Sequence, residues 1–196
     1  MRVLMFGWEF PPHISGGLGT ASYGLTRGLS TIPNLDILFV VPKAYGDEDQ
    51  SKMRVMGAGD VSMDTRHLQH SKLLRQISYI EVNSNLVPYT SSEEYETLVN
   101  KAENTNKKFI HTSMGGKLEF TGKYGKNLYE EIANYALVAG KISEDNDHDV
   151  IHAHDWLCYP AGIAAKNVSG KPLVIHVHAT DFDRSGGNVN PTVFEI

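Results

Sequence analysis

Short apolar runs closed by turn residues recur along this chain and alternate with segments of helical periodicity. They cover residues 2–7, 35–41, 149–153 and 172–177. A continuous apolar run bounded by turn signals is typical of a parallel strand buried on both faces. Strands that alternate with helices predict an α/β fold with a doubly wound parallel sheet. We expect the 196 residues to form one domain.

Apolar residues spaced three and four apart predict helices between these runs. The predicted helices cover residues 18–29, 128–142 and 161–168, and the apolar face of the first consists of Leu18, Ala21, Leu25 and Leu29. Pro160 suits the first helical turn, because the N–H that proline lacks would have no partner there. The remaining expectations are a turn at 155–159, a strand at 77–82, a helix from Ser91 or Ser92 to Lys101, and loops with short elements at 43–75 and 102–125.

Composition and charge exclude several classes of protein. The net charge of −5 argues against a nucleic-acid partner or an anionic membrane surface. No apolar run approaches the roughly 20 residues that span a bilayer, so we expect no integral membrane segment. The apolar stretch Val3–Phe6 is too short for a signal peptide. Cys158, the only cysteine, fits a reducing compartment, and we expect a cytoplasmic protein.

A glycine-rich segment at 8–19 follows the first predicted strand and opens the first helix. Doubly wound sheets bind ligands at this place, where helix N-termini favour a phosphate or carboxylate. Gly16 and Gly17 would let a ligand approach the main chain, although a tight turn alone would also explain them. The dinucleotide fingerprint fails, because Ser22 stands at its third glycine. No phosphate-binding loop of the Walker type is present either.

Four histidines lie at the ends of two neighbouring strands. Residues two apart on a strand share a face, so the side chains of His152 and His154 point the same way, and so do those of His176 and His178. We expect His152 and His176 in the core and the other two facing the crevice beyond the strand ends. A metal centre is disfavoured because neither strand supplies a carboxylate or cysteine to complete it, and Asp155 points to the opposite face. We therefore expect no metal and no cofactor.

Three segments, in this order, are similar to a known enzyme family. They read MRVLMFGWEFPPHISGGLGTASYGLTRGLS, VIHAHDW and VIHVHATDFDRSGG. The chain thereby resembles the N-terminal domain of the retaining GT-B glycosyltransferases, the group that contains glycogen and starch synthases and family 4 glycosyltransferases. Ile14 and Thr20 stand where bacterial glycogen synthases have Lys and Asp, which favours a family 4-like enzyme of unknown acceptor.

The resemblance implies a role for each matched residue. Gly16 and Gly17 correspond to the loop that approaches the donor diphosphate and sugar. His154 corresponds to the histidine at the reaction centre, and His178 to a histidine of the next strand end, a match for which His176 competes. Asp155 and Asp181 belong to the same segments, and we assign both to the substrate site; a solvated loop is the alternative for Asp181.

The resemblance also implies an activity and two partners. Residues 1–196 would form the Rossmann-like, acceptor-side half of the enzyme, which transfers a hexose from an ADP-, UDP- or GDP-sugar to a carbohydrate or other hydroxyl acceptor. The C-terminal nucleotide-sugar domain would lie outside this chain, so the fragment alone is expected to be inactive. The alternative is a noncatalytic carbohydrate-binding or regulatory remnant of the same fold. A dinucleotide oxidoreductase is disfavoured by the failed fingerprint.

Overall fold

The computed structural model describes residues 1–63, 116–191, 193 and 196. Its main sheet has five parallel strands in the order β3-β2-β1-β6-β7. They are β1 (Arg2–Phe6), β2 (Asp36–Val41), β3 (Arg54–Gly57), β6 (Val150–His154) and β7 (Leu173–His176). The expected α/β fold is therefore confirmed. The strand and helix expected at 77–82 and 91–101 lie outside the described residues.

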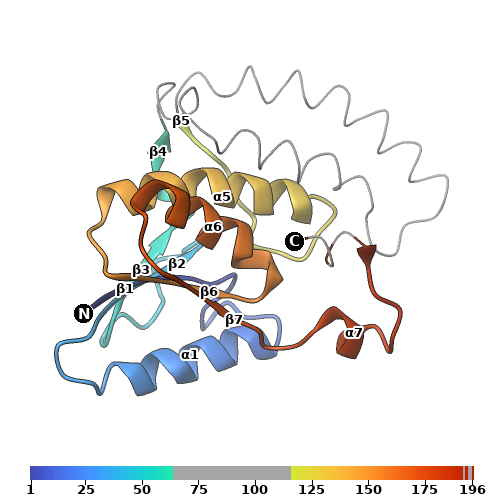
Figure 1. Cartoon of the computed structure of the whole chain (residues 1–196), viewed down its shortest axis with the longest axis horizontal. Helices are drawn as coiled ribbons and strands as arrows, with labels where there is room; N and C mark the ends of the chain where they lie inside the picture. Colours follow the sequence, from blue (N-terminus) through green and yellow to red (C-terminus); the bar gives the residue numbers. More distant parts are fainter. Residues whose placement is uncertain (64–115, 192, 194–195) are drawn as a thin grey trace.

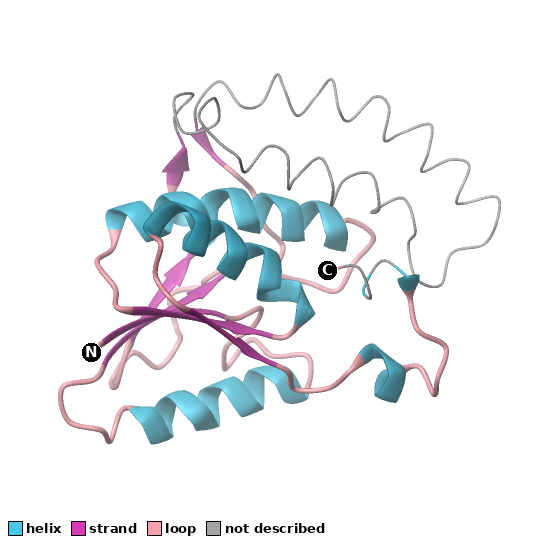
Figure 2. Cartoon of the chain, in the orientation of Figure 1, coloured by secondary structure: helices cyan, strands magenta, loops and turns pink. Residues whose placement is uncertain are grey.

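Helices cover both faces of the sheet (Figure 1). Helix α1 (Gly17–Leu29) lies against one face, and α5 (Leu128–Asp145) with α6 (Tyr159–Ser169) lies against the other. The smaller elements are β4 (Ser62–Met63), β5 (Gly116–Lys117), η1 (Ala58–Asp60), η2 (Trp156–Cys158) and α7 (Asp181–Arg184). Figure 2 shows the resulting three layers of helix, sheet and helix. The three helices expected from apolar periodicity are confirmed.

The side chains of β1 point alternately to the two faces of the sheet and contribute to the core on both. Leu4 and Phe6 pack toward α5 and α6, whereas Val3 and Met5 pack toward α1. Successive side chains of a strand point to opposite faces, so one apolar strand serves both layers. All four side chains are at most 6% exposed. The continuous apolar run at 2–7 thus describes a central strand correctly.

Tyr135 fixes α5 over the carboxyl ends of two strands. Its hydroxyl oxygen lies 3.0 Å from the carbonyl oxygen of Gly7 and 2.7 Å from that of Val40. The side chain is fully buried, and burial raises the pKa of the phenol well above its usual value. The hydroxyl therefore keeps the proton that it donates to this edge of the sheet.

The most deeply buried residues of α1 are not those of the predicted apolar face. Gly19, Ser22 and Thr26 are buried, whereas Ala21 is exposed. These small side chains let the helix approach the sheet closely enough for Ser22 Oγ to lie 3.5 Å from His154 Nδ1. The predicted apolar face is thus only partly buried: Leu18 and Leu29 pack against the core, whereas the most deeply buried positions of α1 are small residues.

The expectation of a strand buried on both faces is wrong for β7. Val174 is 47% exposed and Ile175, which points to the other face, is 42% exposed. β7 is the last strand of the described sheet and pairs with β6 alone. Its apolar composition predicted the strand correctly, but the position of the strand at the edge leaves both faces partly open.

Cys158 closes the turn between β6 and α6. The side chain is 0% exposed, and burial raises the pKa of its thiol well above the usual value. The helix that follows packs tightly on β6, since a Cβ added at Gly162 would lie 2.8 Å from Ala153 Cβ. The predicted turn and the position of Pro160 in the first helical turn are confirmed.

Candidate functional site

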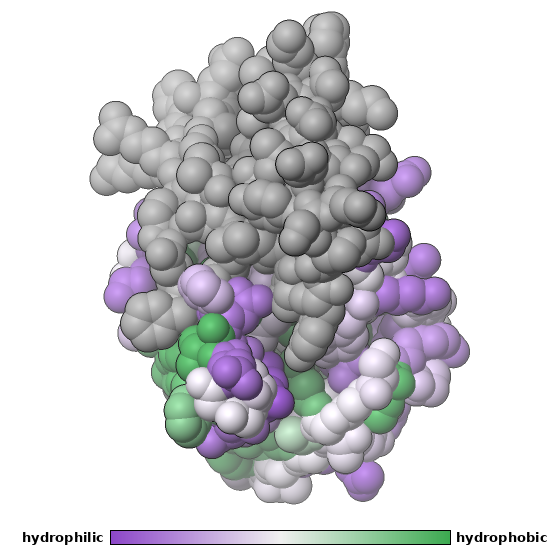
Figure 3. All heavy atoms as spheres, turned by 90° about the vertical axis from the view of Figure 1, so that its right-hand side faces the viewer, coloured by the Kyte–Doolittle hydropathy of each residue, from purple (hydrophilic) through white to green (hydrophobic). Residues whose placement is uncertain are grey.

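The candidate site lies at the carboxyl ends of β1, β6 and β7. Ligands of doubly wound sheets bind at this edge, outside the strand ends. The glycine-rich loop follows β1, and the two histidine pairs end β6 and continue beyond β7. Figure 3 shows the face of the molecule that carries this edge, where hydrophobic side chains (green) lie beside hydrophilic ones (purple).

Gly16 and Gly17 stand at the start of α1 with open space around them. Gly16 is extended, with φ −163° and ψ −160°, a conformation that any residue adopts. A Cβ added at either glycine would meet no atom within 4 Å. Neither packing nor backbone strain therefore requires these glycines, which favours the approach of a ligand over the tight-turn interpretation.

Glu9 occupies part of the expected anion site. Its carboxylate accepts hydrogen bonds from the backbone N–H of Ser15 at 2.7 Å and from that of Gly19 at 3.2 Å. The side chain is only 5% exposed. The chain thus supplies its own anion to the N-terminal turn of α1 and holds the glycine loop in place. Glu9 could not be recognised from the sequence, because an acidic residue after a strand carries no distinctive spacing.

The four histidines form two ring pairs that stack on each other. His154 Nδ1 lies 2.9 Å from His178 Nε2, and His152 Nε2 lies 3.3 Å from His176 Nδ1. Along each strand the rings stack with centroids 4.3 Å apart. A bond between two ring nitrogens needs one donor and one acceptor, so the tautomers within each pair are linked. The predicted common face within each strand is confirmed.

The order of burial within β6 is the reverse of the expected one. His154 is 0% exposed, whereas His152 is half-buried. The expectation of a core position is wrong for His152 and also for His176, which is half-buried. The expectation that His154 faces the crevice is wrong too. Helix α1 covers His154 through the buried Ser22, and the ring of Phe39 lies 6.1 Å from that of His154. His178 is half-buried at the strand end and lies against His154.

Burial and neighbouring rings favour the neutral form of His152, His154 and His178. Burial, followed by the nearby histidines, lowers the pKa of His154 to about 2 and that of His152 to about 4. Burial also lowers the pKa of His178. His154 Nε2 is buried and has no hydrogen-bond partner within the described part of the chain. Neutral rings of this kind donate or accept single hydrogen bonds and carry no charge to a phosphate.

The ring geometry does not favour a metal ion. One ring nitrogen each of His152, His154 and His176 lies within 4.8 Å of the others. However, the rings of His152 and His154 stack, with 28° between their planes. A histidine nitrogen binds zinc at about 2.0–2.1 Å along the lone pair in its ring plane, so stacked rings do not direct two lone pairs at one point. The rings would have to turn to bind an ion.

Asp155 and Asp181 are both engaged within the chain. Asp155 is 1% exposed and adopts a left-handed backbone conformation with φ 63°, which ends the alternation of β6. Its carboxylate forms an ion pair with Arg184 in α7. Asp181 accepts a hydrogen bond from the backbone N–H of Asn190. The geometry thus links both carboxylates to the 181–190 segment, next to the predicted site.

Residues 2–194 match the family model described as the starch synthase catalytic domain. The chain belongs to this family. The chain is also similar to two curated proteins at low identity. It is 24% identical over 187 residues to an uncharacterised glycosyltransferase of Methanocaldococcus jannaschii, covering 95% of this chain and 33% of that protein.

The second relative is the glycogen synthase of Mycobacterium tuberculosis. It is 24% identical over 192 residues, which cover 97% of this chain and 36% of the relative. The chain therefore spans about a third of the length of the curated relatives that it matches. No described helix of this domain is long and apolar enough to cross a membrane.

Proposed function

We propose that the chain is the acceptor-side domain of a retaining glycosyltransferase that moves a hexose from a nucleotide sugar to a carbohydrate or other hydroxyl acceptor. One relationship carries the proposal: His154 Nδ1 lies 2.9 Å from His178 Nε2 and 3.5 Å from Ser22 Oγ. It joins the ends of β6 and β7 to α1, the helix that begins at Gly17. The three segments that resemble the GT-B enzymes thus meet at one edge of the sheet.

The glycine loop, His178 and His154 each have a separate role in this transfer. The glycine loop, held by Glu9, offers the open main chain at Gly16 and Gly17 to the donor. His178 contacts the sugar, and the buried His154 acts as a positioning residue that holds the His178 ring. In a retaining transfer the attacking hydroxyl and the leaving phosphate share one face of the sugar, so catalysis depends on positioning and charge stabilisation. The phosphates would be held by the part of the enzyme outside this chain.

Turnover by the full-length protein tests the proposed function. ADP-, UDP- and GDP-glucose are offered with a neutral oligosaccharide acceptor, and NMR records the anomeric configuration of the product. We expect the product to keep the configuration of the donor. Inversion would contradict the retaining mechanism. Oligosaccharide binding without turnover of any nucleotide sugar would favour the noncatalytic remnant.

A pair of glycine variants tests the place of the donor. Gly17→Val puts a branched side chain into open space at the proposed donor loop, and Gly28→Val does the same at the far end of α1. Both have room to fold. We expect Gly17→Val to raise KM for the nucleotide sugar at least tenfold and Gly28→Val to leave it unchanged. Equal KM values would remove the donor from this loop.

A further inference from the structure

Asp155, which follows the last residue of β6, has a backbone conformation that side chains rarely adopt. Its φ is 63° and its ψ is 168°, a combination that is populated almost by glycine alone. Among the described residues other than glycine, only Asn34 also has a positive φ, and Asn34 lies in an exposed turn. Asp155 is buried, so the surrounding structure must hold its backbone in place. Such residues are found preferentially at functional sites.

Asp155 connects three elements at the carboxyl edge of the sheet. Its backbone N–H donates to the carbonyl oxygen of His176 at 2.8 Å, and its own carbonyl oxygen accepts from the N–H of Cys158 at 2.9 Å. The first bond reaches the last residue of β7, and the second closes the turn into α6. The carboxylate forms the ion pair with Arg184, the last residue of α7. The unusual backbone therefore places a buried carboxylate next to one cation.

The segment 177–184 is anchored at both ends by these contacts. β7 ends at His176, so within the described residues no strand pairing holds the backbone that follows. At the other end, Arg184 closes the single turn of α7, and its N–H donates to the carbonyl oxygen of Thr180 at 3.2 Å. His178 lies between the two anchors. The direction of its ring therefore depends on where Arg184 is held.

The ion pair also acts on the His178 ring through its charges. Burial and His176 lower the pKa of His178, the Asp155 carboxylate acts in the opposite direction, and the Arg184 guanidinium lowers that pKa further. The ring stacks on that of His176 with centroids 4.3 Å apart, and its Nε2 lies 2.9 Å from His154 Nδ1. Asp155 and Arg184 are therefore neighbours of the ring as well as the anchor of its segment.

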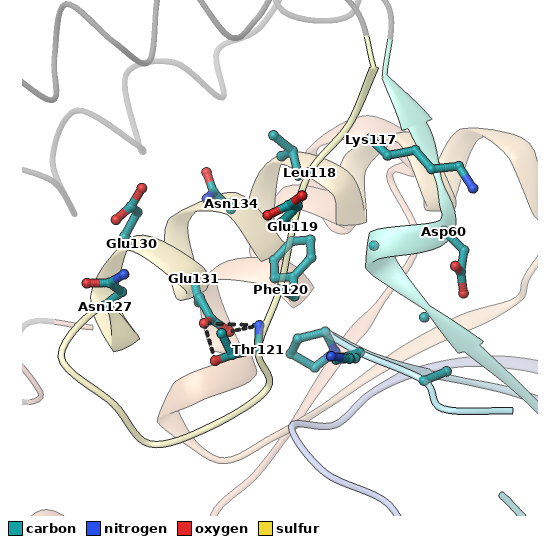
Figure 4. A pocket seen from close by; sticks show the side chains of 15 residues that line it. Asp60, Lys117, Leu118, Glu119, Phe120, Thr121, Asn127, Glu130, Glu131 and Asn134 are labelled. Carbon is teal, nitrogen blue, oxygen red and sulfur yellow. Dashed lines mark hydrogen bonds between the residues drawn. The ribbon is translucent and has the colours of Figure 1, made fainter. Parts of the chain in front are cut away.

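A second loop near the ion pair is also held in place. Glu131 lies on the wall of a cavity of about 700 Å³ and accepts hydrogen bonds from the backbone of residues 121–122 (Figure 4). The same loop carries Tyr124. Burial raises the pKa of the Tyr124 phenol, and the charges of Arg184 and Asp155 also act on it. Tyr124 is therefore neutral and offers Arg184 no anion that competes with Asp155.

We propose that Arg184 is a positioning residue for the His178 ring. Anchored on Asp155, it holds the segment 177–184 so that the ring keeps its contact with His154 and stays at the carboxyl edge of the sheet. The importance of this edge for a sugar rests on the proposed function. Arg184 does not contact the sugar itself, because it acts through His178.

Two other roles fit Arg184 less well. A phosphate bound by Arg184 would have to displace Asp155, and a buried carboxylate that loses its cation is strongly destabilising. A surface ion pair that adds little to stability is the other alternative. The pair of Lys141 and Asp145 in α5 is of that kind, because the Asp145 side chain is 50% exposed, whereas that of Asp155 is 2% exposed.

Proton NMR of the imidazole N–H groups of the full-length protein tests the position of the ring. The N–H shared between His154 and His178 should give a slowly exchanging downfield signal, identified by its loss in His154→Phe. We expect Arg184→Gln to remove or strongly weaken this signal, and Arg184→Lys, which keeps a cation, to retain it. Lys141→Gln is the matched control, since it breaks the exposed pair with Asp145 and should leave the signal unchanged.

Steady-state kinetics of the full-length enzyme test whether this position matters for the transfer. Arg184→Gln should lower kcat about fivefold or more and leave KM for the nucleotide sugar within about twofold. Arg184→Lys should recover kcat to within about threefold of the parent value. The double variant Asp155→Asn/Arg184→Gln leaves no buried carboxylate unpaired, so it should keep the low kcat at a higher Tm than Arg184→Gln alone.

The outcomes separate this proposal from the proposed function. Loss of the N–H signal together with a lower kcat in Arg184→Gln supports the positioning role. The parent kcat in that variant, a lower kcat with an unchanged signal, or an equal loss of the signal in Lys141→Gln would overturn it. If the parent enzyme turns over no nucleotide sugar, the proposed function fails, and the N–H signal alone decides whether Arg184 positions the ring.

Discussion

His154 Nδ1 lies 2.9 Å from His178 Nε2, so a fully buried imidazole at the end of β6 holds a half-buried one just beyond β7. This contact ties the tautomer of the outer ring to that of the inner one. A change at His154 can therefore alter how His178 would contact the proposed sugar without any direct contact between His154 and the ligand.

Replacing His154 by Phe tests this dependence. Phenylalanine keeps an aromatic ring in the buried space and removes the ring nitrogens. We expect kcat of the full-length enzyme to fall about tenfold to a hundredfold, with KM nearly unchanged, because His178 loses the contact that orients its ring. Such a fall corresponds to roughly 1.4–2.7 kcal/mol. Steady-state kinetics and the melting temperature are measured together.

His152→Phe is the matched control, since His152 stacks on the same strand face but pairs with His176. It should leave kcat within about twofold of the parent value. Wild-type kcat in His154→Phe would show that the inner histidine is purely structural.

Acid should destabilise the fold through the same residues. The pKa of His154 is about 2 in the folded chain, below the ordinary value of 6.5, chiefly because the ring is buried. The unfolded state then binds more protons below pH 6.5, so stability is complete above that pH and falls as the pH drops toward the folded pKa. For this one buried ring the slope is about 1.4 kcal/mol per pH unit.

Urea unfolding at pH 7.0, 6.0 and 5.0 measures this slope. The folded pKa of His152, about 4, acts in the same direction. His154→Phe should flatten the dependence of the unfolding free energy on pH. An identical slope in the variant would mean that other groups cause the acid sensitivity.

Glu9→Gln should loosen the donor loop. The glutamine amide offers one oxygen to two backbone N–H groups, so one of Ser15 N and Gly19 N loses its acceptor. Leaving a buried donor unpaired costs about 1–3 kcal/mol. We expect a lower Tm and a raised KM for the nucleotide sugar.

Glu48→Gln is the control for Glu9→Gln, because Glu48 is 7% exposed and accepts from Tyr45 N and Gly46 N in the same manner. It should lower Tm by a similar amount and leave KM unchanged. A KM that rises equally in both variants would reduce Glu9 to a general stabilising residue.

Two glycines of α1 should respond in opposite directions to alanine. A Cβ at Gly19 would lie 2.3 Å from Ile14 Cγ2, so Gly19→Ala should destabilise by about 1–3 kcal/mol through overpacking. A Cβ at Gly24 meets nothing within 4 Å, and Gly24→Ala should stabilise the helix by up to about 1 kcal/mol. Chemical denaturation measures both, and a stabilising Gly19→Ala would contradict the close contact.

The strands and helices were predictable because buried apolar runs and helical spacing are local signals. Such signals at residues 2–7 and 128–142 predicted β1 and α5, and the structure has both elements. β3 was missed inside a segment expected to be loops with short elements, because Arg54–Gly57 offers only four residues and takes its strand form from pairing with β2. Pairing between distant segments leaves no local pattern.

The site was predicted less completely, for a similar reason. Sequence spacing placed His152 and His154 on one face but gave no sign that α1 covers His154, since this depends on Ser22 being small. The contact between Arg184 and Asp155 was also invisible, because 29 positions separate them in the sequence. Burial by a distant element is a tertiary property.

The buried thiol of Cys158 can report how often the surrounding structure opens. A protonated sulfur with no solvent contact does not attack a disulfide reagent, because the thiolate is the nucleophile. With one cysteine in the sequence, each reagent molecule consumed counts one protein molecule in which the junction of β6 and α6 has opened. Labelling rates with and without a bound sugar would therefore report how firmly a ligand at this same carboxyl edge of the sheet holds that junction closed.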